Sequence, residues 1–215
     1  GKGQLIELPL SENFIPFMSE SIMDYNINKR IRSTIGNRHR SMAPHGVYPC
    51  KGDDKWMTIA VGNDDQWKAF CEVIEDKSLI NDSRFKDAMS RLKNQDELDD
   101  IVSDWTKKQD HLKAFHKLQK AGIPSGPVLN ELEALEDPHL VDRKYYETLE
   151  NSELPKLQYP GPLWRMSKTP NHHKSAPPLL GEHNEYIYKT VLEFSDAEYK
   201  RLEDDGHIGM DIIEK

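Results

Sequence analysis

The stretch 36–61 constrains the fold more than any other, because a loop rich in cationic and imidazole side chains runs directly into a two-strand pattern. Its second half holds two runs of β-branched and aromatic residues, 46–50 and 56–61, separated by turn-forming residues at 51–55. This pattern predicts a β-hairpin. Because Pro49 has no N–H to donate to a ladder, we expect the first strand at a sheet edge or at a bulge.

Apolar residues at three- and four-residue steps predict helices on both sides of the hairpin. Before it, we expect one helix over roughly 12–28 with Ser11 as its N-cap. The apolar face of this helix is expected to pack in the core and holds Phe14, Phe17, Met18, Ile22 and Tyr25. After the hairpin, Asn63 and Asn94 are expected to cap two helices, and a third covers roughly 110–121.

In the second half of the chain, Pro and Gly residues limit the length of the predicted helices and strands. The Pro- and Gly-containing segment 123–129 is expected to be extended, as a third strand or a crossing linker. Six prolines in 154–180 exclude a long helix there. Several shorter elements are expected around these segments: a helix at 131–136 with Leu132 and Leu135 inward, a strand at 145–149, a helix after Gly181 with Ile187, Tyr188, Val191 and Leu192 inward, and a last helix behind a capping box at Ser195.

The composition excludes two classes of protein. A net charge of −8 disfavours a general nucleic-acid binder, because a polyanion is repelled except at a local basic patch. No apolar run approaches the ~20 residues that a membrane-spanning helix needs. Cys50 and Cys71 are too few for a disulfide framework and lack metal-ligand spacing, so we expect small core residues in a reducing compartment, the cytoplasm.

Few residue patterns indicate chemistry. Adjacent carboxylate pairs such as Asp99 and Asp100 point apart, and His172-His173 lacks a third ligand at metal spacing, so no metal site is predicted. The loop 38–46 can present guanidinium and imidazole donors to a phosphate or a carboxylate, together with Gly181-Glu182-His183. The same residues also suit a plain polar loop, and residue types alone leave both interpretations open.

Four spaced motifs carry a resemblance that single patterns do not. They are APHGVYPCKGDDKW at 43–56, AGIPSGPV at 121–128, DPHL at 137–140 and PPLLGEHN at 177–184. In this order the sequence resembles the family III CoA-transferases, which include formyl-CoA transferase, carnitine CoA-transferase and the α-methylacyl-CoA racemases. One departure is Arg40-Ser41-Met42-Ala43 at the place of a glycine-rich run in formyl-CoA transferases, which disfavours that subtype.

The resemblance implies an enzyme that moves CoA between an acyl-CoA and a small carboxylic acid through an acyl-aspartyl intermediate, as an interlocked homodimer. The CoA thioester is a substrate, and no permanently bound cofactor is implied. In the family the catalytic aspartate precedes the region matched here, so we expect no catalytic residue in this chain. Because the sequence starts at Gly1 without an initiator Met, we expect a missing N-terminal half as a partner.

These considerations predict an α/β protein with an α+β small domain, in which a hairpin-based sheet is packed by helices. Residues 1–44 and 131–215 are expected to belong to a larger Rossmann-like domain, and 45–130 to form the small domain. The resemblance and the loop chemistry together give the substrate- and CoA-binding candidates Arg38, His39, Arg40, Ala43, His45 and Gly46. A racemase on the same scaffold, or a non-catalytic fragment, remain the alternatives.

Overall fold

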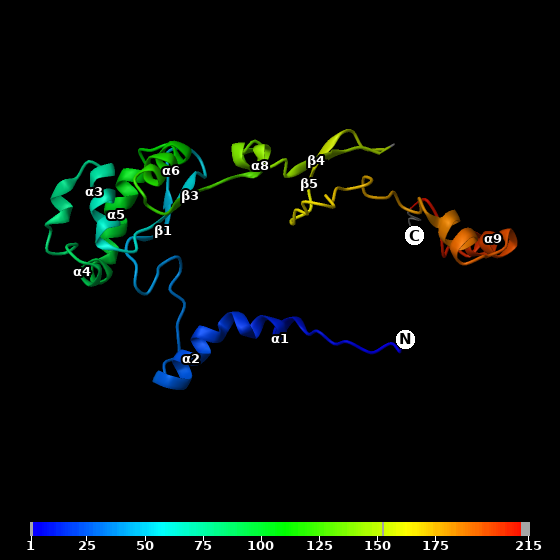
Figure 1. Ribbon diagram of the computed structural model, residues 1–215, viewed down its shortest axis with the longest axis horizontal. Coiled ribbons are helices and arrows are strands. Elements are labelled where there is room, and N and C mark those ends of the chain that lie inside the picture. Colours follow the sequence, from blue (N-terminus) through cyan, green and yellow to red (C-terminus); the bar gives the residue numbers. More distant parts are fainter. Residues whose placement is uncertain (1, 152, 212–215) are drawn as a thin grey trace. The chain divides into compact units, whose positions relative to one another are not determined.

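The computed structural model describes residues 2–151 and 153–211. The chain forms two compact units, Gly1–Val128 and Leu129–Lys215, and Figure 1 labels many of their helices and strands. Across the described residues, no helix combines the length and the apolar character that crossing a membrane requires.

The first unit is built on a three-stranded antiparallel sheet. Strands β1 (His45–Pro49) and β2 (Trp56–Ala60) form the predicted hairpin, and β3 (Ser125–Val128) pairs with the other side of β2. The order β1-β2-β3 places β1, and with it Pro49, at an edge of the sheet. The predicted hairpin, the edge position of Pro49 and the third strand are therefore confirmed.

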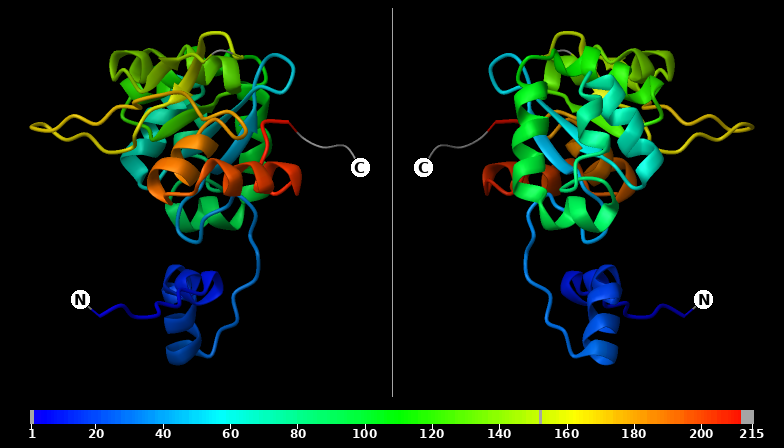
Figure 2. Two further views of the ribbon diagram at one scale, coloured as in Figure 1. Left: turned by 90° about the vertical axis from the view of Figure 1, so that its right-hand side faces the viewer. Right: turned by 90° about the vertical axis from the view of Figure 1, so that its left-hand side faces the viewer.

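Helices cover the sheet. They are α3 (Asp64–Val73), the 3-10 helix η2 (Lys77–Ile80), α4 (Ala88–Lys93), α5 (Gln95–Thr106) and α6 (His111–Lys120). Helix α5 packs against β1, and α6 packs against β2 and β3. In Figure 2 the cyan strands of the hairpin lie against the teal and green helices of this unit. The predicted small sheet with packed helices is thus confirmed.

Alternation along β2 separates a core face from an open face. Met57 and Ile59 are buried, whereas the Thr58 side chain between them is exposed. Met57 and Ile59 join a core that also holds Trp67, Phe70, Phe85, Leu98, Val102 and Leu118. Because side chains alternate across a strand, the row that carries Thr58 is free to line a groove on the other face.

The helix caps follow local chemistry in one case and not in the other. The Asn63 side chain accepts from Gln66 N–H at 2.9 Å, which confirms the predicted cap of α3. Asn94 occupies the N-cap position of α5, as predicted, but its side chain makes no cap hydrogen bond. Its amide donates instead to the carbonyls of Arg84 and Ser90, which ties α4 to the preceding loop.

Both cysteines are buried, as predicted. Burial, with a smaller contribution from Asp110, raises the pKa of the Cys50 thiol to about 11. Burial also raises the pKa of Cys71 to about 12. A nucleophilic cysteine needs an accessible thiolate, so neither residue is suited to that role.

The N-terminal segment departs from the single predicted helix. It forms α1 (Leu10–Phe14), the 3-10 helix η1 (Ile15–Met18) and α2 (Ser19–Asn28), and the first helix begins after Pro9 rather than at Ser11. Pro16, in η1, has no N–H for a helical hydrogen bond, so the α-helical pattern is interrupted there.

The apolar face of this segment is not in a core. Phe17 is 78% exposed, and Phe14, Met18, Ile22 and Tyr25 are also exposed. The prediction that this face packs in the core is wrong for the described chain. Periodicity shows that a helix has an apolar face but not what covers it, and the buried apolar cluster found among the described residues lies around the sheet and helices α3 to α6.

The second unit consists of short elements. They are α7 (Glu131–Leu135), α8 (Pro138–Asp142), the hairpin of β4 (Tyr146–Leu149) and β5 (Leu157–Pro160), the π-helix η3 (Tyr186–Val191) and α9 (Asp196–Asp204). The Ser195 capping box of α9 is confirmed, because Ser195 and Glu198 bond each other's backbone N–H. Strand β4 is also confirmed, and its partner β5 lies in the segment predicted only as an extended connection.

Two predicted apolar faces of this unit are wrong in part. Leu132 on α7 is exposed, and so are Ile187, Val191 and Leu192 in and after η3, whereas Leu135 and Tyr188 are half-buried. In a π-helix the hydrogen bonds run over five residues, as from Leu192 N–H to the Ile187 carbonyl, so the angular step differs from the 3.6-residue period assumed from the sequence. Residues spaced for one α-helical face then no longer share a face.

Glu147 on β4 fixes a turn and gives a pH-dependent prediction. Its Oε2 accepts from the His173 N–H at 2.8 Å, and its Oε1 lies 3.0 Å from His172 Nδ1. These bonds lower the pKa of Glu147 below 4.5. A lowered pKa in the folded state means that the contact stabilises the turn above pH ~4.5, and that this stabilisation is lost as the pH falls through the lowered value.

An NMR titration of the Glu147 carboxyl carbon should give a pKa below 4.5, and this pKa should move upward in the variant His172→Ala. A pKa of Glu147 that is not lowered would contradict the contact.

Candidate functional site

A groove of about 480 Å³ lies on the open face of the three-stranded sheet. Its floor is one cross-strand row, Val47, Thr58 and Gly126, which are directly paired in the register of β1, β2 and β3. One wall is the loop from Gly36 to Arg38 with the start of β1, and the other is the turn that leads from Pro124 into β3. The sequence folds this way because antiparallel pairing aligns the small and polar side chains of alternate positions on one face.

Two glycines of the sheet lie close to neighbouring side chains, Gly126 beside Thr58 on the open face and Gly46 beside Tyr48 on the core face. A Cβ on Gly126 would lie 3.3 Å from Thr58 Oγ1, and one on Gly46 would lie 3.1 Å from the Tyr48 ring. The Thr58 hydroxyl also donates to the Gly126 carbonyl at 3.2 Å. Both glycines therefore serve close packing of the strands rather than a special backbone conformation.

Arg38 is held at the groove by two carboxylates on helix α5. Its Nη2 donates to Asp96 at 2.6 Å and to Asp99 at 2.8 Å, and its Nε donates to Asp99 at 3.2 Å. These hydrogen bonds raise the pKa of Arg38. The side chain remains 41% exposed, so the guanidinium is oriented without being removed from solvent.

Asp99 connects Arg38 to the core. Its second oxygen accepts from the Tyr48 hydroxyl at 2.8 Å. Burial, and then this hydrogen bond, raise the pKa of Tyr48, so the phenol stays protonated as a donor. The chain Tyr48–Asp99–Arg38 thus links an inward-pointing side chain of β1 to the rim of the groove.

The two histidines of the loop are placed differently. Nδ1 of His45 lies 2.7 Å from the carbonyl oxygen of Asn37, which can only accept, so Nδ1 carries a proton. In the neutral ring this leaves Nε2 as an acceptor. His39 does not line the groove; its Nδ1 accepts from the Ser41 N–H at 3.2 Å, and its ring centroid is 5.2 Å from that of His45.

The six binding candidates from the sequence therefore separate into two groups. Arg38, His45 and Gly46 line the groove. His39, Arg40 and Ala43 do not: the first two are exposed, and Ala43 is buried. The groove also contains residues that sequence reasoning did not select, namely Asn37, Thr58, Ser125 and Gly126.

Ala43 is tied to the core by a buried arginine that sequence reasoning missed. Arg91 is 1% exposed; its Nε donates to the Ala43 carbonyl at 3.0 Å and its Nη1 to the Phe85 carbonyl at 3.2 Å. Its Nη2 donates to Asp64 at 2.8 Å, and the guanidinium lies over the Trp67 ring. Arg91 therefore fixes the end of the loop 36–44 just before β1 begins.

The side chains that line the groove are suited to binding a ligand rather than to forming a covalent bond with it. A guanidinium, an imidazole and a hydroxyl converge there, and such groups bind carboxylate, phosphate or carbonyl oxygens. No group of three or more side chains suited to a metal ion occurs within the described ranges 2–151 and 153–211. The fold and the groove together define an α+β unit whose open sheet face presents groups of the kind that contact small polar or anionic groups.

The comparisons with known proteins identify the family. The model of CoA-transferase family III matches residues 1–184, and the chain belongs to this family. A probable CoA-transferase of Mycobacterium tuberculosis is 33% identical over 168 residues, which are 76% of this chain and 21% of that protein. Human succinyl-CoA:glutarate CoA-transferase is 28% identical over 196 residues, 91% of this chain and 44% of that protein.

A solved structure supports the fold. A CAIB/BAIF family protein of Brucella suis superposes with a TM-score of 0.75 at 24% identity, over 87% of this chain and 48% of that one. The chain spans half or less of the length of the relatives and the structure named here. The resemblance expected from the four sequence motifs is thereby confirmed.

Proposed function

We propose that the chain is the C-terminal portion of an enzyme that transfers CoA between an acyl-CoA and a small carboxylic acid. The observation that carries this proposal is the groove itself. It lies within the part of the chain that the family model matches, and Arg38 and His45 both line it on the open face of the sheet. The relatives named above are CoA-transferases, which favours transfer over racemisation on the same scaffold.

The groove residues have distinct roles in this proposal. Arg38 Nη1 makes no hydrogen bond within the described chain, so it can donate to an anionic oxygen while Nη2 and Nε stay with the carboxylates of α5. His45 presents Nε2, which accepts a proton when neutral and donates a hydrogen bond when protonated. Together they would position an acid's carboxylate or a thioester carbonyl, which are the two groups between which CoA moves.

The covalent step belongs to another part of the protein in this proposal. An aspartate carboxylate attacks the thioester carbonyl, releasing the CoA thiolate and forming an acyl-aspartyl anhydride. The thiolate attacks the aspartyl carbonyl of this anhydride and releases the donor acid, which leaves an aspartyl-CoA thioester. The acceptor carboxylate attacks that thioester to form a second anhydride, and the released thiolate attacks the acceptor's acyl carbonyl, which gives the product acyl-CoA and restores the aspartate.

We assign this aspartate to an N-terminal half that belongs to a larger Rossmann-like domain. Residues 1–44 and 131–215 would also contribute to that domain, and residues 45–130 would form the small domain. The enzyme would be a cytoplasmic, interlocked homodimer.

Exposed apolar side chains support a covering partner for the N-terminal segment. Fourteen large apolar residues lie on the surface between positions 5 and 35: Leu5, Ile6, Leu8, Leu10, Phe14, Ile15, Phe17, Met18, Ile22, Met23, Tyr25, Ile27, Ile31 and Ile35. Exposed large apolar side chains in this number indicate a surface that another part of the protein or another chain covers.

The test is CoA transfer by the full-length protein. Succinyl-CoA and glutarate, the substrates in the name of the human relative, are the first pair to assay, with other dicarboxylic acids as acceptors. His45→Ala and Arg38→Ala are each expected to lower kcat/KM about tenfold or more, which equals about 1.4 kcal/mol of transition-state stabilisation.

Arg40→Ala provides the matched control, because Arg40 lies in the same loop but does not line the groove. It is expected to leave kcat/KM within about twofold, as an exposed substitution away from the site should. Unchanged kcat/KM in His45→Ala and Arg38→Ala would contradict the role of the groove. Exchange of the α-proton of an acyl-CoA in deuterated water, without any acid acceptor, would indicate a racemase instead.

A further inference from the structure

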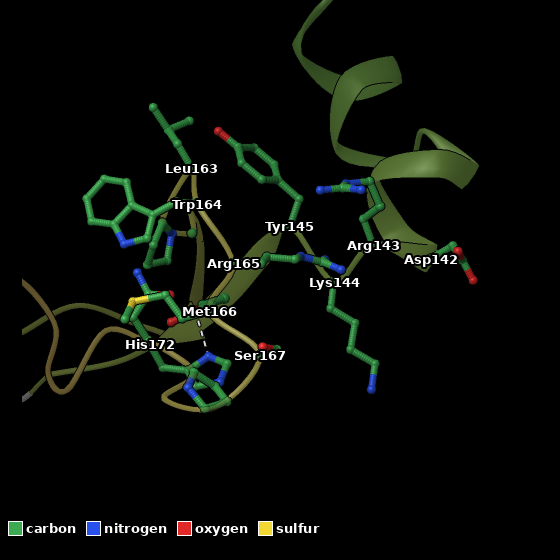
Figure 3. A pocket seen from close by; sticks show the side chains of 15 residues that line it. Asp142, Arg143, Lys144, Tyr145, Leu163, Trp164, Arg165, Met166, Ser167 and His172 are labelled. Atoms are coloured by element: carbon green, nitrogen blue, oxygen red, sulfur yellow. Dashed lines mark hydrogen bonds and ion pairs between the residues drawn. The ribbon is translucent and has the colours of Figure 1, made fainter.

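A cavity of about 590 Å³ lies between the end of α8, the start of β4 and the segment that follows β5, within the unit Leu129–Lys215 (Figure 3). Residues 131–215 are assigned above to the larger domain, so a part of the protein outside this chain would cover their exposed side chains. The groove of the first unit is different, because hydrogen bonds within that one unit fix the arginine that lines it. These hydrogen bonds determine how Arg38 meets a ligand.

The two carboxylates on α5 restrain Arg38 unequally. Asp99 accepts from Nε at 3.2 Å and from Nη2 at 2.8 Å, whereas Asp96 accepts from Nη2 alone, at 2.6 Å. The Asp99 side chain is 24% exposed and the Asp96 side chain is 89% exposed. Because an almost fully solvated carboxylate is free to reorient, its ion pair adds little order to its partner. Asp99 therefore sets the orientation of the guanidinium, although the Asp96 contact is the shorter one.

The core holds Asp99 in turn. Its other oxygen accepts from the Tyr48 hydroxyl at 2.8 Å, and Tyr48 is 3% exposed. Gly46 and Tyr48 are two positions apart on β1 and so share its core face. A Cβ on Gly46 would lie 3.1 Å from the Tyr48 hydroxyl oxygen, so the glycine gives the phenol room to lie along the strand and reach α5.

This arrangement makes the direction of the Arg38 donors matter more than its charge. Two carboxylates offset the single positive charge of the guanidinium, so the group offers directed N–H donors rather than a net positive field. An arginine side chain has many rotamers, and losing this freedom on binding opposes association. A network that orders the guanidinium before a ligand arrives removes that cost.

We infer that Asp99 and Tyr48 are positioning residues for Arg38, which they hold so that Nη1 stays available to an oxygen of the acyl donor or the acid. This inference rests on the proposed function, because it assigns how the guanidinium of the groove is oriented for CoA transfer. Neither positioning residue lines the groove. Tyr48 acts from the core face of β1, and Asp99 acts from α5 through its bonds to Arg38.

Hydrogen exchange at the Arg38 Nε–H tests the tether without an assay of activity. The signal is followed by ¹⁵N NMR of the full-length protein and is assigned by its loss in Arg38→Lys. In Asp99→Asn the one carbonyl oxygen accepts from the buried Tyr48 hydroxyl and leaves amide N–H groups against Arg38, so exchange should be about tenfold faster. Tyr48→Phe, which removes only the core tether, should speed it about threefold. Asp100→Asn removes the same charge from an exposed position of α5 and is the matched control, with unchanged exchange.

CoA-transfer kinetics of the full-length protein, with the acid that it accepts, test the consequence. Asp99→Asn is expected to lower kcat/KM about fivefold. In an Arg38→Ala background the same substitution should change kcat/KM by less than about 1.5-fold, because a residue that acts only through Arg38 has nothing left to position. A variant that merely loosens the fold lowers kcat/KM equally in both backgrounds.

The outcomes separate this inference from the proposed function. Unchanged exchange in Asp99→Asn and Tyr48→Phe, or an equal loss of kcat/KM in both backgrounds, overturns the positioning role. An unchanged kcat/KM in Asp99→Asn, where Arg38→Ala lowers it, overturns the positioning role and keeps the proposed function. An unchanged kcat/KM in Arg38→Ala rejects the role of the groove in CoA transfer, and the positioning role with it, even where exchange shows an intact tether.

Discussion

Replacing Arg91 with methionine is expected to lower the free energy of unfolding by about 3 kcal/mol. The variant keeps much of the side-chain volume but removes the donors to the Ala43 and Phe85 carbonyls, and a buried group left without its partner costs roughly 1–3 kcal/mol. The contact of the guanidinium with the Trp67 ring is lost as well. Urea unfolding followed by circular dichroism measures the change, as a shift of the midpoint at constant slope.

Asp64→Asn is the control for the ion pair of Arg91. Asp64 is 54% exposed, so its carboxylate is solvated when unpaired, and the substitution should cost less than about 1 kcal/mol. The difference between the two variants isolates the buried carbonyl bonds from the charge pair. Equal and small losses in both variants would show that Arg91 does not hold the loop end.

Local signals account for the parts of the fold that were predicted. The hairpin, its edge proline and the Asn63 cap each depend on residues within a few positions of one another, which is the range over which backbone chemistry acts. The same is true of the capping box at Ser195. Such features can be predicted from a single sequence because the residues that interact lie within a few positions of each other.

The wrong predictions concern what covers an apolar face. The spacing of Phe14, Phe17 and Ile22 correctly indicates an amphipathic segment, but burial depends on elements elsewhere, and these residues are exposed here. In η3 the hydrogen-bond pattern itself departs from the α-helix, so the period used for Ile187 and Val191 does not apply. The spacing of apolar residues therefore does not determine which element covers an apolar face, nor whether the helix is an α-helix or a π-helix.

The candidate site was predictable in part. Arg38 and His45 were selected because they belong to a basic loop before a strand, and both line the groove. Their orienting partners were not found, because Asp99 is 61 positions from Arg38 and 51 from Tyr48 in the sequence. The spacing of Asp96 and Asp99 by three residues, on one face of a helix, is the only sequence signal for that pair.

Asp99→Ala is expected to have the second-largest effect on stability, a loss of about 2 kcal/mol. Tyr48 is 3% exposed, and its hydroxyl would lose its acceptor, at a cost of roughly 1–3 kcal/mol. Arg38 would keep Asp96, whose side chain is 89% exposed, and such a solvated pair contributes little. Denaturant unfolding measures the loss, and Asp96→Ala is the matched control, expected to change stability by less than about 0.5 kcal/mol.

A double-mutant cycle with Tyr48→Phe distinguishes the buried hydrogen bond from the pairing with Arg38. If the bond between Tyr48 and Asp99 dominates, the loss in the double variant should be smaller than the sum of the two single losses, by about 1 kcal/mol. If the two single losses add strictly, the stabilising contribution of Asp99 comes from its contact with Arg38 instead. In either case Asp99→Ala frees Nε of Arg38, so CoA-transfer kinetics of this variant report whether the orientation of the guanidinium, rather than its presence alone, serves the groove.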